Sequence, residues 1–136
     1  MFQLVYISTA RGPILPEGVE QILAASRRNN ARKGITGLLV AGRRRFLQAL
    51  EGPEQAVLDT YAEIKRDPRH HALVLLTGRS VEERAFGGWA MAFEAGEDGR
   101  AEDSLRGMVE ELTAGLSDKS LRAHFLGFAE LQGRAA

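Results

Sequence analysis

The chain has 136 residues, of which 44% are apolar and 26% are charged, and this length and composition predict one globular domain. A chain of this size buries enough surface to form a core by itself, and the absence of cysteine excludes disulfide frameworks, thiol chemistry and cysteine-ligated zinc. Eighteen basic residues balance eighteen acidic ones, so no net field favours nucleic acid or a membrane surface as a partner.

The first segments of the chain predict a strand followed by a helix. Residues 2–8 alternate in character, which predicts a strand with Tyr6 and Ser8 on the same face. Pro16 opens a stretch with apolar residues at helical spacing, and Asn29 and Asn30 are expected to end this helix. The N-terminal sequence has no secretory pattern, and no window approaches the roughly 20 apolar residues of a membrane span, so we expect a cytoplasmic protein.

The next segments predict two strands and a second helix. Residues 35–40 and 45–51 are the predicted strands, and the second places Phe46, Gln48 and Leu50 on one face. A polar glutamine therefore lies between two apolar neighbours that we expect to be buried. A second helix begins after residues 52–53, carries an apolar stripe that includes Ile64, and ends near residues 67–68.

The remaining segments complete one sheet and add C-terminal helices. Residues 73–77 and 89–93 predict two more strands, so the element order predicts an α+β fold of the ferredoxin-like type, βαββαββ, with five strands and two helices on one face. Two more helices follow, the first capped by Asp103 or Ser104. The second carries an apolar stripe of Leu121, Phe125 and Phe128, and we expect this pair of helices to cover the other face of the sheet.

Several common functional motifs are missing from the sequence. It contains no glycine-rich dinucleotide fingerprint, no P-loop and no nucleophile elbow of a hydrolase. His70, His71 and His124 lack the spacing of metal ligands, so we expect no metal site. The basic clusters at residues 27–28, 32–33 and 43–45 are compatible with an anionic-ligand patch or a solvated rim. We favour the rim because no base-stacking aromatic residues accompany them.

Five segments, spaced in order along residues 4–91, carry a recognisable pattern. They are LVYIS at 4–8, a segment from 26 to 39 that includes SRRNN and GITGLL, FLQALEG at 46–52, DPRHH at 67–71 and RAFGGWAM at 84–91. Together they resemble the BLUF family, which implies a flavin held non-covalently between the two helices and the sheet, and a small red shift in blue light. The resemblance covers residues 1 to about 95. It implies a flavin-binding photosensor domain at 1–95 and a C-terminal helical cap or output segment at 96–136.

The resemblance assigns the photochemistry to Tyr6 and Gln48. It implies that light drives an electron from Tyr6 to the flavin, that a proton follows through Gln48, and that recombination leaves the amide rearranged, by rotation or by tautomerisation. The residue chemistry fits, because an amide has a donor end and an acceptor end and so can bridge a phenol to a flavin edge. An ordinary core aromatic is the alternative for Tyr6. For Gln48 the corresponding alternative, a core residue with no photochemical role, is weaker, since an unpartnered buried amide costs about 1–3 kcal/mol of stability.

The resemblance also implies a set of flavin-binding residues. Asn30 matches a position that contacts the O4 and N3 edge, although an Asn at a helix end is also a common C-cap. Arg69 matches a position facing O2, where a cation stabilises negative charge, and its alternative is a surface arginine. Asp67 either orients nearby polar groups or ends the second helix. The full set is Ile22, Asn29, Asn30, Gln48, Ile64, Asp67, Arg69 and His70.

The resemblance assigns signal output to Trp89 and Met91. We add Ser8 to this output set, because it shares a strand face with Tyr6. We expect FAD as the cofactor, with FMN or riboflavin as alternatives, because the sequence shows no signature for the phosphate end. No enzyme domain follows residue 95, so we expect a short, non-enzymatic photoreceptor that signals to an unidentified protein partner and forms a homo-oligomer. The alternatives are a flavin-free binding or assembly module with the same fold and an enzyme that uses the fold for redox turnover. The intact residue set argues against the first, and the second lacks a catalytic constellation.

Overall fold

The structure is a computed structural model that describes residues 1–11, 16–42, 44–68, 70–86, 92–95, 107, 109–111 and 113–134. Its labelled elements are, in order, β1 (Phe2–Ala10), α1 (Pro16–Lys33), β2 (Thr36–Ala41), β3 (Arg45–Gly52), α2 (Glu54–Arg66), β4 (His70–Ser80), β5 (Ala92–Ala95) and α4 (Lys119–Arg134). The predicted order is confirmed from β1 to β5 and for the last helix, whereas the first of the two predicted C-terminal helices lies largely outside the described residues. Within the described part of the chain, no helix is long and apolar enough to cross a membrane.

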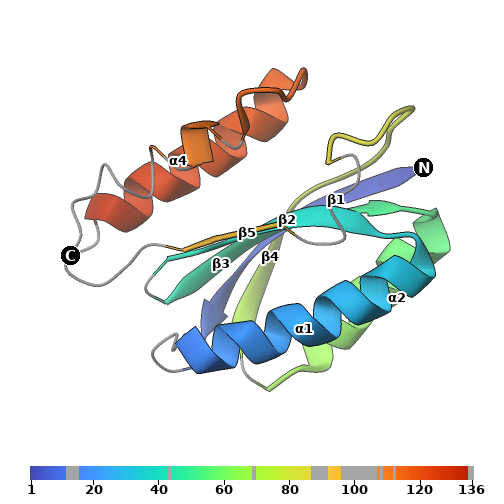
Figure 1. The fold of residues 1–136 in the computed structure, drawn as a ribbon, viewed down its shortest axis with the longest axis horizontal. Coiled ribbons are helices and arrows are strands. Elements are labelled where there is room, and N and C mark those ends of the chain that lie inside the picture. The colour runs from blue at the N-terminus through green and yellow to red at the C-terminus, as the bar shows by residue number, and fades with distance from the viewer. Residues whose placement is uncertain are drawn as a thin grey trace.

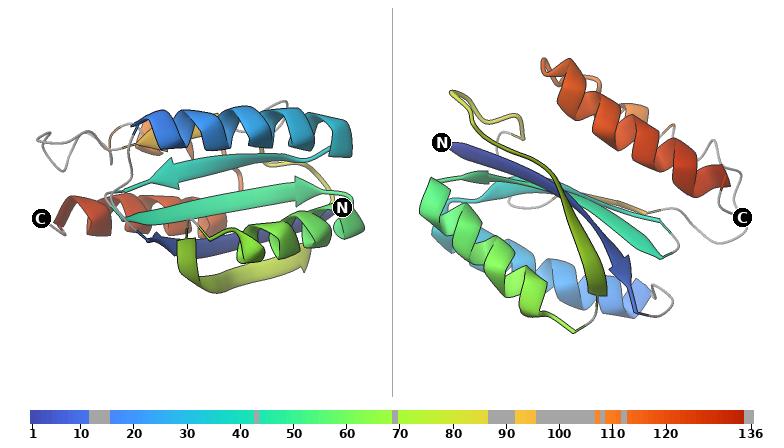
Figure 2. Two further views of the ribbon diagram at one scale, coloured as in Figure 1. Left: turned by 90° about the horizontal axis from the view of Figure 1, so that it is seen from below. Right: turned by 180° about the vertical axis from the view of Figure 1, so that it is seen from behind.

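One five-stranded sheet organises the molecule, with the strand order β4-β1-β3-β2-β5. The first four strands pair antiparallel, as in ferredoxin-like folds, and β5 joins the edge parallel to β2. Helices α1 and α2 lie on one face and α4 on the other (Figures 1 and 2). The predicted α+β, ferredoxin-like fold with two helices on one face is therefore confirmed.

The alternation of side chains in the strands divides the core into two layers. On the α1/α2 face, Leu4, Tyr6, Phe46 and Leu50 pack with apolar residues of both helices. On the other face, the buried set is Val5, Leu38, Val40, Leu47 and Ala49, together with Phe86, Val109, Leu121, Phe125, Phe128 and Ala129. This confirms the predicted division of faces and shows that the apolar stripe of α4 covers the sheet. Burial contributes about 1.5–3 kcal/mol for each large side chain, so α4 is an integral part of the fold.

Three predicted boundaries differ from the structure. Helix α1 does not end at Asn29 and Asn30 but continues to Lys33, because Gly34 supplies the left-handed conformation (φ +73°) that stops it. Strand β4 extends beyond the apolar run at 73–77, since it pairs with β1 from Phe2 to Ala10. Strand β5 ends at Ala95 rather than at residue 93. The N-terminal part of the predicted strand at 89–93 lies outside the described residues, as do the predicted capping residues at 103–104.

Candidate functional site

A pocket lies between α1 and α2 and against β3. Its cavity volume is about 150 Å³, roughly ten times what a single water needs. The lining residues are Ala25, Ser26, Asn29, Asn30 and Lys33 of α1, Gln48 and Leu50 of β3, and Thr60, Glu63, Ile64 and Asp67 in or next to α2. The pocket is therefore large enough for a ligand, and its wall combines apolar groups with side-chain amides.

Tyr6 and Gln48 meet beneath the pocket because they are direct cross-strand partners in β1 and β3. The Tyr6 hydroxyl donates a hydrogen bond to Gln48 Oε1, and the two residues are only 3% and 5% exposed. The ring of Tyr61 on α2 lies 5.3 Å from the Tyr6 ring, tilted by 55°. The structure thus brings together the pair that the sequence predicts to be central.

Electrostatics keep the Tyr6 phenol neutral. Burial raises the pKa of Tyr6 far above its ordinary value, and the neighbouring Tyr61 and Asp67 add to the shift because a second negative charge is unfavourable there. The pKa of Tyr61 is also raised by burial. Tyr6 is therefore a fixed hydrogen-bond donor throughout the neutral pH range.

Asn30 is almost completely buried, at 2% exposure, and lines the pocket from α1. The C-cap interpretation of this residue is wrong, because the helix runs on for another turn to Lys33. Asn29 also lines the pocket, and its Oδ1 accepts a hydrogen bond from Arg32 Nη2 at 3.0 Å. Both predicted asparagines therefore lie at the pocket.

The α2 side supplies Ile64 and Asp67. Ile64 lines the pocket and packs against the core cluster that contains Tyr6. Asp67 follows the last residue of α2, and its backbone N–H donates to the carbonyl oxygen of Ile64 at 3.1 Å. Asp67 therefore ends the helix and faces the pocket, so the two interpretations of this residue are compatible.

Other predicted residues lie partly or wholly outside the described part of the chain. Arg69, Trp89 and Met91 lie outside it, as do the side chains of Ile22 and His70, although the backbone of His70 begins β4 and pairs with Ala10. Ser8 is fully buried, and its partner Phe46 lies on the Tyr6 face, as predicted. Among the residues that the structure describes, no cluster of His, Asp or Glu is arranged to hold a metal.

Sequence reasoning placed Lys33 only in a basic cluster with Arg32, and it missed the contacts of Lys33 with Glu63 and Thr60 at the polar rim of the pocket. Lys33 Nζ lies 3.7 Å from Glu63 Oε2 and 3.5 Å from Thr60 Oγ1, so these contacts join α1 to α2. Helical spacing carries the signal that identifies these residues. Thr60 is one turn before Ile64 and Lys33 is about one turn after Asn30, so each shares a face with a predicted site residue.

These residues fit the ring system of a flavin. Asn30 on α1 and Gln48 on β3 each present a donor and an acceptor, which suits the alternating carbonyl and N–H groups of the flavin's pyrimidine edge. Ala25, Leu50 and Ile64 supply apolar wall for the ring faces. The donor set and the wall chemistry therefore match the cofactor that the sequence pattern implies.

Comparison with known proteins gives matches to light sensors. A family model described as "Sensors of blue-light using FAD" matches residues 1–92. The beta subunit of a photoactivated adenylate cyclase from Euglena longa is 37% identical over 83 residues, which make up 61% of this chain and 10% of the cyclase subunit. The chain therefore spans about a tenth of the length of that relative.

Solved structures extend the likeness to almost the whole chain. BlrP1 of Klebsiella pneumoniae, in a complex with manganese and cyclic di-GMP, has a TM-score of 0.81 and 26% identity, covering 98% of this chain and 33% of that one. BlrB, a BLUF protein whose dark-state structure is known, has a TM-score of 0.73 and 26% identity over 98% of this chain and 96% of its own. With the pocket geometry and the family match in agreement, the chain belongs to the BLUF family of sensors of blue light that use FAD.

Proposed function

We propose that this chain is a short photoreceptor in which Tyr6 and Gln48 convert light absorption into a rearranged hydrogen bond. The observation that carries this proposal is the hydrogen bond that the Tyr6 hydroxyl donates to Gln48 Oε1. The same Gln48 amide also lines the pocket. When bound, the flavin supplies absorption of blue light and an electron acceptor. The protein supplies a neutral phenol as donor and an amide that relays the proton and then changes its partners.

The other pocket residues position the ligand in this proposal. Asn30 would hold the O4 and N3 edge of the flavin and Ile64 would pack on its ring, because both line the pocket. Asp67 adds negative charge near Tyr6, which disfavours phenolate in the dark. The family pattern supports binding roles for Ile22, Asn29, Arg69 and His70, and output roles for Ser8, Trp89 and Met91.

Output passes through protein contacts rather than through catalysis in this chain. Residues 1–95 act as the sensor and residues 96–136 as the output segment, a division supported by the family match, which ends at residue 92. The chain spans 96% of the BLUF protein BlrB, which supports a short sensor that signals to a separate protein. Because α4 shares a core with the sheet, a change in the sheet can reach this segment directly. We also propose that the chain forms a homo-oligomer.

The test is the colour of the protein purified from a flavin-replete host. We expect a yellow protein whose absorption shifts reversibly to the red in blue light, and chromatography of the released cofactor will show FAD. FMN or riboflavin in the extract would correct the choice of cofactor. A colourless protein that also fails to take up added FAD would overturn the proposal and favour a flavin-free module.

A further inference from the structure

A row of polar residues crosses the sheet on the face opposite the pocket. Gln3 on β1 is the cross-strand partner of Glu51 on β3 and of Arg79 on β4, and Glu51 is also the partner of Thr36 on β2. By alternation, Gln3 shares a face with Val5, whose side chain belongs to the core beneath α4. The row therefore lies at one end of the layer that α4 covers.

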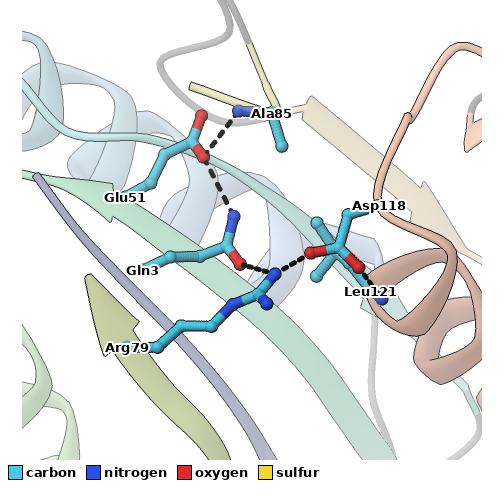
Figure 3. A network of polar contacts seen from close by, with 6 residues as sticks. All are labelled: Gln3, Glu51, Arg79, Ala85, Asp118 and Leu121. Atoms are coloured by element: carbon cyan, nitrogen blue, oxygen red, sulfur yellow. Dashed lines mark hydrogen bonds and ion pairs between the residues drawn. The ribbon is translucent and has the colours of Figure 1, made fainter. Parts of the chain in front are cut away.

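The side chains of this row form a continuous chain of hydrogen bonds (Figure 3). Arg79 Nη2 donates to Gln3 Oε1 at 3.4 Å, and Gln3 Nε2 donates to Glu51 Oε2 at 3.3 Å. The Gln3 amide thus turns its acceptor to a cation and its donor to an anion, so its orientation is fixed by charge. Gln3 is 3% and Glu51 0% exposed, which means that these contacts are shielded from water.

One end of the row holds the segment that leads to β5. The Glu51 carboxylate accepts hydrogen bonds from the backbone N–H of Ala85 at 2.9 Å and of Phe86 at 2.7 Å. Arg84 Nη1 donates to Thr36 Oγ1 at 2.8 Å, and Thr36 Oγ1 in turn donates to Glu51 Oε1 at 3.0 Å. Residues 85 and 86 are therefore held to the sheet by the buried Glu51 carboxylate, while Arg84 also donates to the carbonyl oxygens of Glu51 at 3.3 Å and Gly34 at 2.7 Å.

The other end of the row holds the start of α4. Arg79 forms an ion pair with Asp118, which is the residue just before the helix (Figure 3). Asp118 Oδ1 accepts a hydrogen bond from the Leu121 N–H at 3.0 Å, as an N-cap does, and its carbonyl oxygen accepts one from the Arg122 N–H at 3.1 Å. The Arg79 and Asp118 side chains are 46% and 27% exposed, so salt screens this pair more than the buried part of the row.

The same two strands carry the light-sensitive pair. Tyr6 and Gln48 lie on β1 and β3, each three residues from Gln3 and Glu51, and project to the opposite face. We propose, on the basis of the proposed function, that the row Thr36–Glu51–Gln3–Arg79 couples the segment at 84–86 to the N-terminal end of α4, with Arg79–Asp118 as its releasable contact. Movement of β1 against β3 then loosens or tightens the first turn of α4.

The test in the dark is amide-resolved hydrogen exchange at Leu121 and Arg122. Arg79→Met should raise exchange at both amides about two- to fivefold, as expected for loss of one exposed ion pair. Asp118→Asn keeps the capping oxygen and should give a similar rise. Arg44→Met, at an exposed turn, is the matched control and should change neither amide. Raising the salt from about 0.05 to about 0.5 M should raise exchange in the wild type but not in Arg79→Met.

Coupling along the row requires an effect from its buried middle. Gln3→Met removes both amide contacts, yet residue 3 is two contacts away from Asp118. We expect exchange at Leu121 and Arg122 to rise about twofold in this variant, and in Gln3→Asn if the methionine variant does not fold. Unchanged exchange at these amides in a folded residue 3 variant would overturn the coupling.

Illumination separates this inference from the proposed function. In the wild type, blue light should change exchange at Leu121 and Arg122, and Arg79→Met should abolish that change while keeping the red shift. A red shift with no light-dependent change at these amides would refute transmission along the row. Absence of any red shift would instead refute the proposed function, and the measurements in the dark would still decide whether the row couples its two ends.

Discussion

Tyr6→Phe changes stability in two separable ways. The substitution removes the hydroxyl that donates to Gln48 Oε1 and retains a ring to pack beside Tyr61. At neutral pH the buried amide oxygen loses a donor, so the free energy of unfolding should fall by about 1–3 kcal/mol. Because the ring is kept, no cavity adds to this loss.

At alkaline pH the same substitution should become less harmful. Burial, reinforced by Tyr61 and Asp67, holds the pKa of folded Tyr6 far above the value near 10 that it has in the unfolded chain. Above pH 10 the unfolded chain therefore loses a proton that the folded chain keeps. The stability contributed by the neutral phenol is fully present below pH 10 and is lost as the pH rises, reaching a loss of about 1.4 kcal/mol at pH 11.

Urea denaturation in the dark at pH 8, 10 and 11, with a fixed excess of FAD, measures both effects. The stability difference between the wild type and Tyr6→Phe should narrow by about 1.4 kcal/mol from pH 8 to pH 11. Tyr61 is present in both proteins, so its own titration cancels from the difference. Tyr61→Phe should still show the loss of stability at alkaline pH that comes from Tyr6. Parallel curves for the wild type and Tyr6→Phe over this range would refute the buried, neutral phenol.

Three further substitutions test the packing that positions the site, each by chemical denaturation. Gly52→Ala should lower the free energy of unfolding by about 2 kcal/mol or more, because φ is +158° at Gly52 and a Cβ there would lie 2.7 Å from the carbonyl oxygen of Gly34. Gly107→Ala, with open space around it, is the control, and equal stability of the two variants would contradict this prediction. Glu51→Gln should cost about 2–4 kcal/mol, since an amide donor replaces one of two acceptors facing backbone N–H groups, and a loss below about 0.5 kcal/mol would show that these contacts are weak. Phe125→Ala should cost about 3–5 kcal/mol by opening a cavity between α4 and the sheet, whereas a small loss would mean that α4 does not close the core.

The sequence predicts the faces of the strands well because alternation is a local property. Tyr6 and Ser8 lie on one face of β1 as predicted, and Gln48 lies between the buried Phe46 and Leu50 on the same side of the sheet. The contact between Tyr6 and Gln48 itself depends on the register between β1 and β3. Alternation does not determine that register. The pairing of Tyr6 with Gln48 is therefore predicted from the resemblance to a family and not from the pattern of the strands.

Features set by distant contacts could not be predicted in the same way. The end of α1 depends on Gly34, whose backbone conformation outweighs the turn tendency of the asparagine pair before it. Glu51 resembles a polar residue at the end of a strand, yet its carboxylate is buried because its partners come from residues 3, 36, 85 and 86. Lys33 and Glu63 lie on different helices, so their approach at the pocket rim required the packed structure.

The light-minus-dark absorption spectrum of Gln48→Ala tests the central role of this amide most directly. Gln55→Ala is the matched control, because Gln55 is exposed on α2, does not line the pocket, and donates a side-chain hydrogen bond to Asp59 Oδ1 one turn further along the helix. At equal flavin occupancy, the wild type and Gln55→Ala should show the same long-lived red shift, and Gln48→Ala should bind flavin without forming it. A long-lived red shift of wild-type size in Gln48→Ala would contradict the mechanism.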